Sequence, residues 1–370
     1  MPHYNKQMIS FFLTTKCNLR CKYCYNSKER NQRQEQSLSL EKAKVGLRSF
    51  FETNSSRHLR FYGPGEPTQE FQLLKDIVEY AKSLDESITT EVQTNGCFSD
   101  EECEWLSDNM NIIWISFDGE PDIQNIQRPL SLGKPSSPVI EKNVKMIVER
   151  KSKAMVGARV TMTNLNLHRQ KEMLDYFHSL GIRYVWSDPL FPSVGEIPVC
   201  NDLEKSKNYH FNMDKYVDEF VVAYHYAKEL GMFYGSFLIC NFDGICNKHC
   251  RACTPVPHLT TDGYISACDL VTFGENAGHM DCFVYGKWNE ESRTYDYDYS
   301  KITKLQNRTT ENMLHCSTCE VKEHCGGYCL GEVMNETGSL LGQKPTTCKA
   351  IKKLAKEIGF IKEQYKFLHP

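Results

Sequence analysis

The 370-residue sequence lacks an apolar run long enough to span a bilayer, and it lacks an apolar segment near its start that would direct secretion. It also lacks a large excess of either charge, since the net charge is −3. A broad basic surface for DNA or RNA is therefore excluded as the default expectation. We accordingly predict a cytoplasmic protein with no membrane partner and no nucleic-acid partner.

Cysteine is what the sequence has in excess, with 17 residues. In a reducing compartment, closely spaced cysteines more often bind metal or do redox chemistry than form disulfides. The isolated Cys97, Cys103, Cys200 and Cys282 fit the ordinary role of small buried hydrophobic residues. The remaining cysteines lie close together in polar, glycine-containing sequence, and that spacing predicts metal sites.

The first two thirds of the chain alternate between short apolar runs and amphipathic stretches. This alternation predicts βαβ units and an α/β fold with a parallel sheet. Six units make a partial (β/α)6 TIM-like barrel, whose chemistry is expected at the C-terminal ends of the strands. The expected strands are 9–14, 59–62, 89–93, 112–117, 156–162 and 184–187. The expected helices are 40–51 (N-capped by Ser39), 70–83, 100–107, 139–149, 170–180 and 213–230.

The texture of the sequence changes between Tyr234 and Cys246, and eleven of the cysteines follow. We therefore predict a barrel domain over residues 1–238 and a cysteine-rich domain over 239–370, closed by an amphipathic helix at 350–368. The lysines of this helix are expected to form a solvated face.

Cys17, Cys21 and Cys24 directly follow the first expected strand, in the spacing C-x3-C-x2-C. Three thiolates can ligate three irons of a [4Fe–4S] cluster and leave the fourth iron open for a substrate or cofactor. A zinc site would normally need a fourth ligand close by, and none follows.

This triplet, with Tyr23 before the last cysteine, resembles the signature of radical S-adenosylmethionine (SAM) enzymes. The resemblance implies that SAM binds the open iron and is cleaved to a 5′-deoxyadenosyl radical. Segments at the ends of the next three strands resemble the SAM contacts of that family, although Pro64 and Gly65 depart from the usual G-G-E-P turn. The SAM-binding residues implied in this way are Gly63, Gly65, Glu66, Gln93, Asn95, Ser116, Asp118 and Arg128.

The C-terminal cysteines resemble the SPASM domain of radical SAM maturases in order and spacing. The resemblance implies two auxiliary [4Fe–4S] clusters, and hence three clusters in the chain. The first would use Cys246 or Cys250, together with Cys253, Cys268 and Cys329. The second would use Cys316, Cys319, Cys325 and Cys348. Zinc bound by four cysteines is the main rival at these positions.

SPASM enzymes oxidise ribosomally made peptides or proteins, and the resemblance therefore implies a peptide maturase that forms a crosslink or removes hydrogen. Asp269, directly after Cys268, matches the Asp proposed as a base in anaerobic sulfatase-maturing enzymes, which form formylglycine. Tyr62 and Asn26 depart from that group. The sequence is also compatible with a radical SAM dehydrogenase of a small molecule and with a zinc-stapled binding module.

The implied partners are a peptide or protein substrate and an external electron donor such as a flavodoxin or ferredoxin. The barrel is expected to begin by residue 9, which leaves no room before it for a leader-peptide recognition domain. A separate recognition protein, or direct binding of the substrate, would then be needed.

Overall fold

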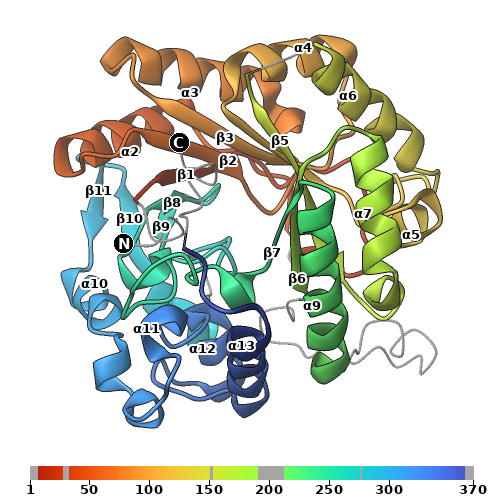
Figure 1. Cartoon of the computed structure of the whole chain (residues 1–370). Coiled ribbons are helices and arrows are strands. Elements are labelled where there is room, and N and C mark those ends of the chain that lie inside the picture. Colours follow the sequence, from red (N-terminus) through yellow and green to blue (C-terminus); the bar gives the residue numbers. More distant parts are fainter. Residues whose placement is uncertain (1–6, 28–32, 151–152, 191–211, 276, 363–370) are drawn as a thin grey trace.

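The computed structural model describes residues 7–27, 33–150, 153–190, 212–275 and 277–362 (Figure 1). Its strands form one sheet in the order β11-β10-β9-β8-β1-β2-β3-β4-β5-β6-β7. The strands from β1 to β7 run parallel, in chain order, with helices between them. The predicted α/β fold with a partial TIM-like barrel is therefore confirmed.

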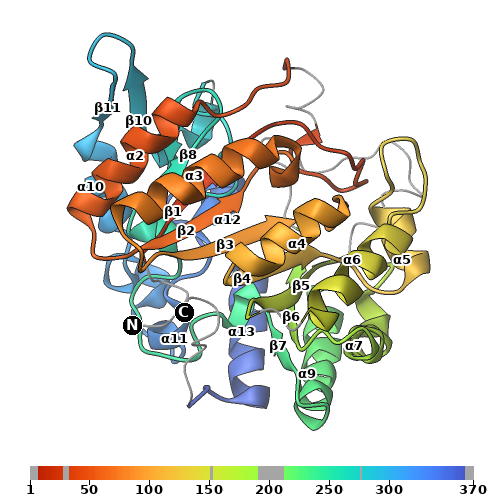
Figure 2. The ribbon, with the colours of Figure 1, turned by 90° about the horizontal axis from the view of Figure 1, so that it is seen from above.

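The barrel strands are short and their side chains are largely buried, as expected for parallel strands covered by helices. The strands are β1 (Ile9–Phe12), β2 (His58–Tyr62), β3 (Thr89–Thr94), β4 (Ile112–Ser116), β5 (Met155–Met162), β6 (Tyr184–Pro189) and β7 (Phe233–Gly235). The outer helices are α2 (Leu40–Thr53), α3 (Phe71–Leu84), α4 (Asp100–Asn109), α5 (Pro121–Gln127), α6 (Ser137–Glu149), α7 (Gln170–Ser179) and α9 (Met213–Glu229). Figure 2 shows these helices lying outside the curved sheet.

Local sequence explains where several of these helices begin. Ser99 and Glu102 form a reciprocal capping box at the start of α4. Ser39 occupies the predicted N-cap position of α2, but its side chain makes no capping hydrogen bond. A proline in the first turn, Pro121 in α5 and Pro138 in α6, suits positions where no backbone N–H bond is needed.

The C-terminal part extends the barrel sheet. β8 (His258–Leu259) pairs in parallel with β1, and β9 (Tyr264–Ser266), β10 (Val284–Asn289) and β11 (Thr294–Tyr297) follow as antiparallel neighbours. The helices here are α10 (Tyr299–Gln306), α11 (Lys322–Cys325), α12 (Leu330–Thr337) and α13 (Pro345–Ile358). α13 packs against α9 of the barrel (Figure 1). Both predicted domains thus contribute strands to one sheet.

Several details differ from the sequence-based expectations. β7 and α5 were not indicated, because segments this short show no clear periodicity. The closing helix runs from Pro345 to Ile358 rather than over 350–368, and residues 363–370 lie outside the described part. Among the residues that the structure describes, no helix combines the length and apolar character that a membrane crossing needs.

Candidate functional site

One cavity at the C-terminal ends of the barrel strands collects most of the predicted site residues. Its wall includes the whole cysteine triplet and residues from the ends of β2 to β6. Cysteines of the C-terminal part complete the wall from the opposite side. The predicted residues lining it are Cys17, Cys21, Cys24, Gly63, Gly65, Glu66, Gln93, Asn95, Ser116, Arg128, Cys250, Cys268, Asp269 and Cys329.

The cysteine loop after β1 is held by backbone hydrogen bonds on both sides. Arg20 and Lys22 donate their amides to the carbonyls of Pro129 and Gln127, each at 2.8 Å. Burial raises the pKa of the Cys21 thiol to about 12, an effect that the nearby Arg128 opposes. The bare thiol is therefore a poor nucleophile, and binding a metal would have to displace its proton.

The turn after β2 packs directly onto this loop. The amide of Glu66 donates to the carbonyl of Lys16 at 2.7 Å. A Cβ atom at Gly65 would lie 2.3 Å from the same carbonyl oxygen, so no larger residue fits there. Gly65, which departs from the G-G-E-P pattern, is thus the residue that allows the turn and the cysteine loop to touch.

Glu66 is buried, and its carboxylate accepts four hydrogen bonds from the protein. The donors are the amide and hydroxyl of Thr68 at 3.2 and 3.1 Å, the Thr94 hydroxyl at 2.7 Å and the Asn95 amide at 2.7 Å. Burial raises the pKa of Glu66, and these bonds oppose that shift. The carboxylate therefore joins the ends of β2 and β3, and most of its acceptor capacity is already used.

The side chain of Asn95 continues this connection toward the cysteines. Its amide nitrogen donates to Asn18 at 2.7 Å and lies 3.9 Å from the Cys17 sulfur. Its oxygen accepts from the Cys97 amide at 2.8 Å. The ends of β2 and β3 thus position the first cysteine of the triplet.

Tyr23, Asp118 and Arg128 form a second connection behind the triplet. Tyr23 hydrogen bonds with the Asp118 carboxylate, and Arg128 donates to the Tyr23 hydroxyl at 2.7 Å. Asp118 also accepts from the Thr161 amide at 2.9 Å, is fully buried and does not line the cavity. Arg128 does line it, and its buried Nε has no hydrogen-bond partner among the described residues. Of these two predicted cofactor contacts, only Arg128 faces the cavity.

Asp269 lies on the opposite wall and is paired with an arginine that no sequence motif indicated. Arg60, on β2, donates to both carboxylate oxygens, at 2.9 and 3.0 Å. Burial alone would raise the pKa of Asp269, but Arg60 and the nearby His258 outweigh it and hold the pKa at about 2. As placed, Asp269 is ionised and is a weak proton acceptor.

The C-terminal cysteines divide into two groups of neighbours. The thiol of Cys250 hydrogen bonds with Cys253, and this bond, burial and the nearby Cys329 and Cys268 thiols raise the pKa of Cys250. The thiols that affect the pKa of Cys325 are instead those of Cys348 and Cys316. Similarly, the Cys319 thiol raises the pKa of Cys348, after the effect of burial.

Cys246 stands between these groups. After burial, the Cys325 thiol contributes most to its raised pKa, and Cys253 contributes less. In the described part of the chain, no three Cys, His, Asp or Glu side chains converge closely enough to hold a single metal ion.

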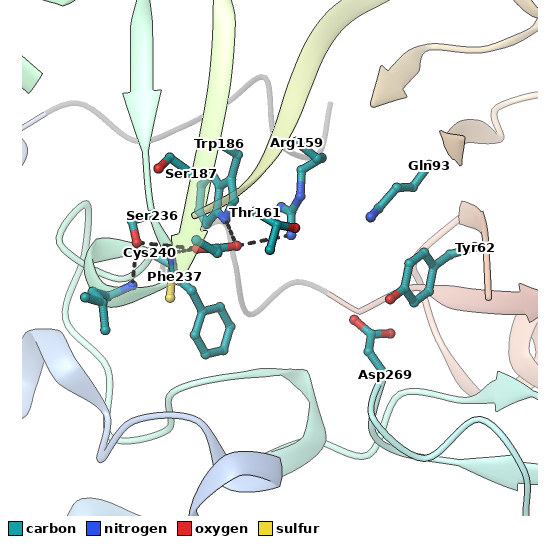
Figure 3. A network of polar contacts seen from close by, with 12 residues as sticks. Tyr62, Gln93, Arg159, Thr161, Trp186, Ser187, Ser236, Phe237, Cys240 and Asp269 are labelled. Carbon is teal, nitrogen blue, oxygen red and sulfur yellow. Dashed lines mark hydrogen bonds and ion pairs between the residues drawn. The ribbon is translucent and has the colours of Figure 1, made fainter. Parts of the chain in front are cut away.

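A further set of polar residues lines the cavity at β5 and β6. Asp188 accepts from the Phe237 amide at 2.6 Å and the Trp186 indole at 2.7 Å, and it lies 3.4 Å from Arg159. Figure 3 shows Trp186 and Ser236 on one side of the view and Tyr62, Gln93 and Asp269 on the other, with Arg159 drawn between them. The sequence analysis did not predict Arg159, Asp188 or Arg60 as site residues. The signal that could have indicated them is a charged residue within an otherwise apolar strand.

Comparison with known proteins gives a match to the family described as Radical SAM superfamily over residues 11–177. An uncharacterised protein of Methanocaldococcus jannaschii is 28% identical over 50% of this chain, and the match spans 63% of that relative. The radical SAM cyclopropyl synthase TigE of Paramaledivibacter caminithermalis is 22% identical over 95% of this chain and 73% of its own length. A cysteine-type anaerobic sulfatase-maturating enzyme of Clostridium perfringens is 23% identical over 85% of both chains.

Two solved structures share the fold over almost the whole chain. The anSMEcpe structure with bound AdoMet has a TM-score of 0.74 and 16% identity, and it covers 95% of this chain and 96% of its own. The Streptococcus suis SuiB structure bound to S-adenosylmethionine has a TM-score of 0.65 and 15% identity, and it covers 94% of this chain and 78% of its own. The similarity extends through the C-terminal part as well as the barrel.

Proposed function

We propose that this enzyme, whose residues 11–177 form a radical SAM domain, is a maturase that oxidises a residue of a ribosomally made peptide or protein. The observation that carries the proposal is the shared cavity, in which the N-terminal cysteine triplet and three C-terminal cysteines face one space. A substrate held there would lie between a site that generates a radical and a site able to accept an electron. That order suits an oxidation in which the substrate loses a hydrogen atom, a proton and an electron.

The relatives support a peptide or protein as the substrate class. Their names include a cyclopropyl synthase and a sulfatase-maturating enzyme, and structures with the same fold are described as bound to a Cp18Cys peptide or to the precursor peptide SuiA. A radical SAM domain uses one [4Fe–4S] cluster and SAM, which when bound supply the 5′-deoxyadenosyl radical. Cys17, Cys21 and Cys24 would hold that cluster.

The first auxiliary cluster would be held by Cys250, Cys253, Cys268 and Cys329, and the second by Cys316, Cys319, Cys325 and Cys348. We choose Cys250 over Cys246 because its thiol neighbours are the other three proposed ligands of the first cluster. A flavodoxin or ferredoxin would supply electrons from outside. A separate recognition protein would bind the substrate's leader peptide where one is present.

The protein's own residues would orient the reacting groups. Arg128 and Ser116 face the space where the SAM carboxylate is expected, and the hydrogen bonds of Glu66 hold the strand ends in place. Tyr25 and Tyr62 hydrogen bond to each other, and the Tyr25 hydroxyl lies 3.4 Å from the Asp269 carbonyl. Asp269 is the proposed proton acceptor, and its basicity would be set by the ion pair with Arg60.

A formylglycine-forming sulfatase maturase is the second candidate, because Asp269 follows Cys268 and a relative with that name matches over 85% of the chain. Tyr62 and Asn26 weigh against it, as Tyr62 places a second tyrosine hydroxyl beside Tyr25 in the cavity. A sulfatase peptide with a cysteine at the modified position separates the two candidates directly.

The test uses anaerobically reconstituted protein with SAM and a reductant. We expect about twelve irons per chain, four for each of three clusters. We also expect 5′-deoxyadenosine to form together with a product lighter by two hydrogen atoms from a precursor peptide encoded near the gene. The variant with Cys17, Cys21 and Cys24 changed to Ala should keep about eight irons and form neither product. A chain that binds about two zinc ions and little iron would contradict the proposal.

A further inference from the structure

Two arginines project from the barrel strands into the cavity, and their charges are neutralised to different extents. Arg60 on β2 contacts both carboxylate oxygens of Asp269 through one terminal nitrogen, at 2.9 and 3.0 Å, and lies 3.5 Å from Glu91. Among the described residues, Arg159 on β5 has one carboxylate neighbour, Asp188, at 3.4 Å. A guanidinium carries five N–H donors, so a single long contact leaves most of its binding capacity unused.

Asp188 is also committed elsewhere. Its shorter hydrogen bonds come from the Phe237 amide at 2.6 Å and the Trp186 indole at 2.7 Å, and the Ser236 hydroxyl lies 3.4 Å away. Burial raises the pKa of this carboxyl, and Arg159 is the largest of the opposing influences. Asp188 therefore anchors the segment after β7 at least as firmly as it neutralises Arg159.

The guanidinium of Arg159 is held in place by two indole rings. Its central carbon lies 5.9 Å from the centre of the Trp114 ring and 5.4 Å from that of the Trp186 ring. Gly157 makes room for this arrangement, because a Cβ atom there would lie 2.3 Å from the Trp114 ring. The two rings come from β4 and β6, on either side of the strand that carries Arg159, and so they limit its movement.

The Arg159 side chain remains 27% exposed, and the residue lines the cavity although its strand is interior. Its charge reaches Tyr62: burial and Asp269 raise the pKa of Tyr62 to about 12, and Arg159 is one of the groups that oppose the rise. In the part of the chain that the structure describes, the other charged groups lining this cavity are Arg60, Glu66, Arg128, Asp188, Arg251 and Asp269. The carboxylates of Asp269, Glu66 and Asp188 each accept hydrogen bonds from other protein groups. The guanidinium of Arg159 therefore keeps N–H donors that can bind an anion from outside the protein.

We propose that Arg159 binds a carboxylate of the substrate, carried either by an acidic side chain or by a free C-terminus. This inference rests on the proposed peptide substrate and narrows it to peptides with an acidic group at or next to the residue that reacts. A planar guanidinium and a carboxylate can form two parallel hydrogen bonds. An arginine fixed between two rings loses little freedom on binding, which favours such a contact.

The test measures binding without turnover, by equilibrium dialysis of radiolabelled probes against the anaerobic holoenzyme with SAM. N-acetyl-glutamate α-amide represents a side-chain carboxylate and N-acetyl-glycine a terminal one, while N-acetyl-glutamine α-amide is the neutral control. We expect at least one acidic probe to bind about tenfold or more tightly than the neutral one, equivalent to about 1.4 kcal/mol. The acidic probe that binds better identifies the source of the carboxylate.

Arg159→Gln should abolish this preference, while the iron content and the affinity for SAM stay unchanged. Arg150→Gln is the matched control, because Arg150 is a surface residue paired with Asp108. If Arg159→Gln loses iron, Arg159→Lys decides: a preference reduced severalfold supports the proposal, and an unchanged preference overturns it. No preference in the wild type, or a loss of SAM affinity in Arg159→Gln with the preference intact, also overturns it. If peptides are not modified while the acidic probes bind through Arg159, the maturase proposal alone fails.

Discussion

At the scale of single residues, the carboxylate of Glu66 shows how a proposed cofactor contact can also be a structural one. Its four hydrogen bonds link the turn after β2 to the end of β3, beside the residues that position Cys17. An amide in its place puts two N–H groups where the protein already supplies donors. Each buried donor that loses its acceptor costs about 1–3 kcal/mol.

We therefore expect Glu66→Gln to lower the unfolding temperature and the iron content of the triplet site, and to weaken SAM binding as a consequence. Glu70→Gln is the matched control on the same turn, since Glu70 is partly exposed and pairs with Lys16. Thermal unfolding, iron analysis and SAM dialysis on both variants check this. Full iron content with a tenfold or larger loss of SAM affinity would instead make Glu66 a direct ligand of SAM.

Asp269 gives the second prediction at this scale. Asn keeps the shape and one acceptor for Arg60 but removes the negative charge. We expect Asp269→Asn to retain its iron and its cleavage of SAM while product formation falls by about 10²-fold. This loss is at the lower end for a general base, because a carboxylate with a pKa of about 2 is a weak one.

The measurement is the ratio of 5′-deoxyadenosine to modified peptide in one reaction. Asp281→Asn, an exposed aspartate paired with Lys301, serves as the control. A proportional fall in both products, or an unchanged ratio at full activity, would remove Asp269 from the proton-transfer step.

At the scale of elements, the segment from Cys246 to Cys253 carries three cysteines with different neighbours. Cys250 lies with Cys253, Cys268 and Cys329, whereas the main thiol neighbour of Cys246 is Cys325. We expect Cys250→Ala to lose about four of about twelve irons, one cluster's complement, and Cys246→Ala to keep nearly all of them. Iron and sulfide analysis on the two variants decides between them. Cys103→Ala, on α4, controls for the loss of a thiol outside both groups, and iron loss confined to Cys246→Ala would reverse the assignment.

Much of the barrel could be predicted from its elements, because hydrophobic periodicity and capping residues are local signals. The strand at Ile112–Ser116 and the helix at Gln170–Ser179 lie within two residues of their predicted bounds. The pairing of Arg60 with Asp269 could not be predicted, because 209 positions separate the two residues and only the pairing of β8 with β1 brings their segments together. The contact between Asp118 and Tyr23 could not be predicted either, because 95 positions separate these two residues.

For the cysteines, too, local spacing could be read from the sequence, whereas contacts between distant segments could not. Spacing alone indicated metal sites, but the choice between Cys246 and Cys250 depended on which loops fold over one another. Arg159 and Asp188 were missed because a charged residue in an apolar strand has no partner that can be read from the sequence.

At the scale of the whole molecule, the sheet joins the two predicted domains. The amide of Ser10 in β1 donates to the carbonyl of Pro257 at 2.9 Å, and β8 then continues the sheet. Leu259 packs so closely on α2 that a Cβ atom at Gly46 would lie 2.6 Å from it. α13, which also belongs to the C-terminal part, packs against α9 of the barrel. Removing residues 239–370 would therefore expose a strand edge and apolar surface of the barrel.

We accordingly expect the fragment 1–238 to aggregate or to unfold without a cooperative transition, because an open edge and uncovered apolar contacts both favour association. Circular dichroism and urea titration of the fragment check this. Coexpression with residues 239–370 is the control, and it should restore a soluble complex if the loss comes from the missing interface. The fragment lacks the proposed auxiliary cysteines but keeps Cys17, Cys21 and Cys24. A soluble fragment that unfolds cooperatively, binds about four irons and cleaves SAM would instead show that the barrel is an independent domain.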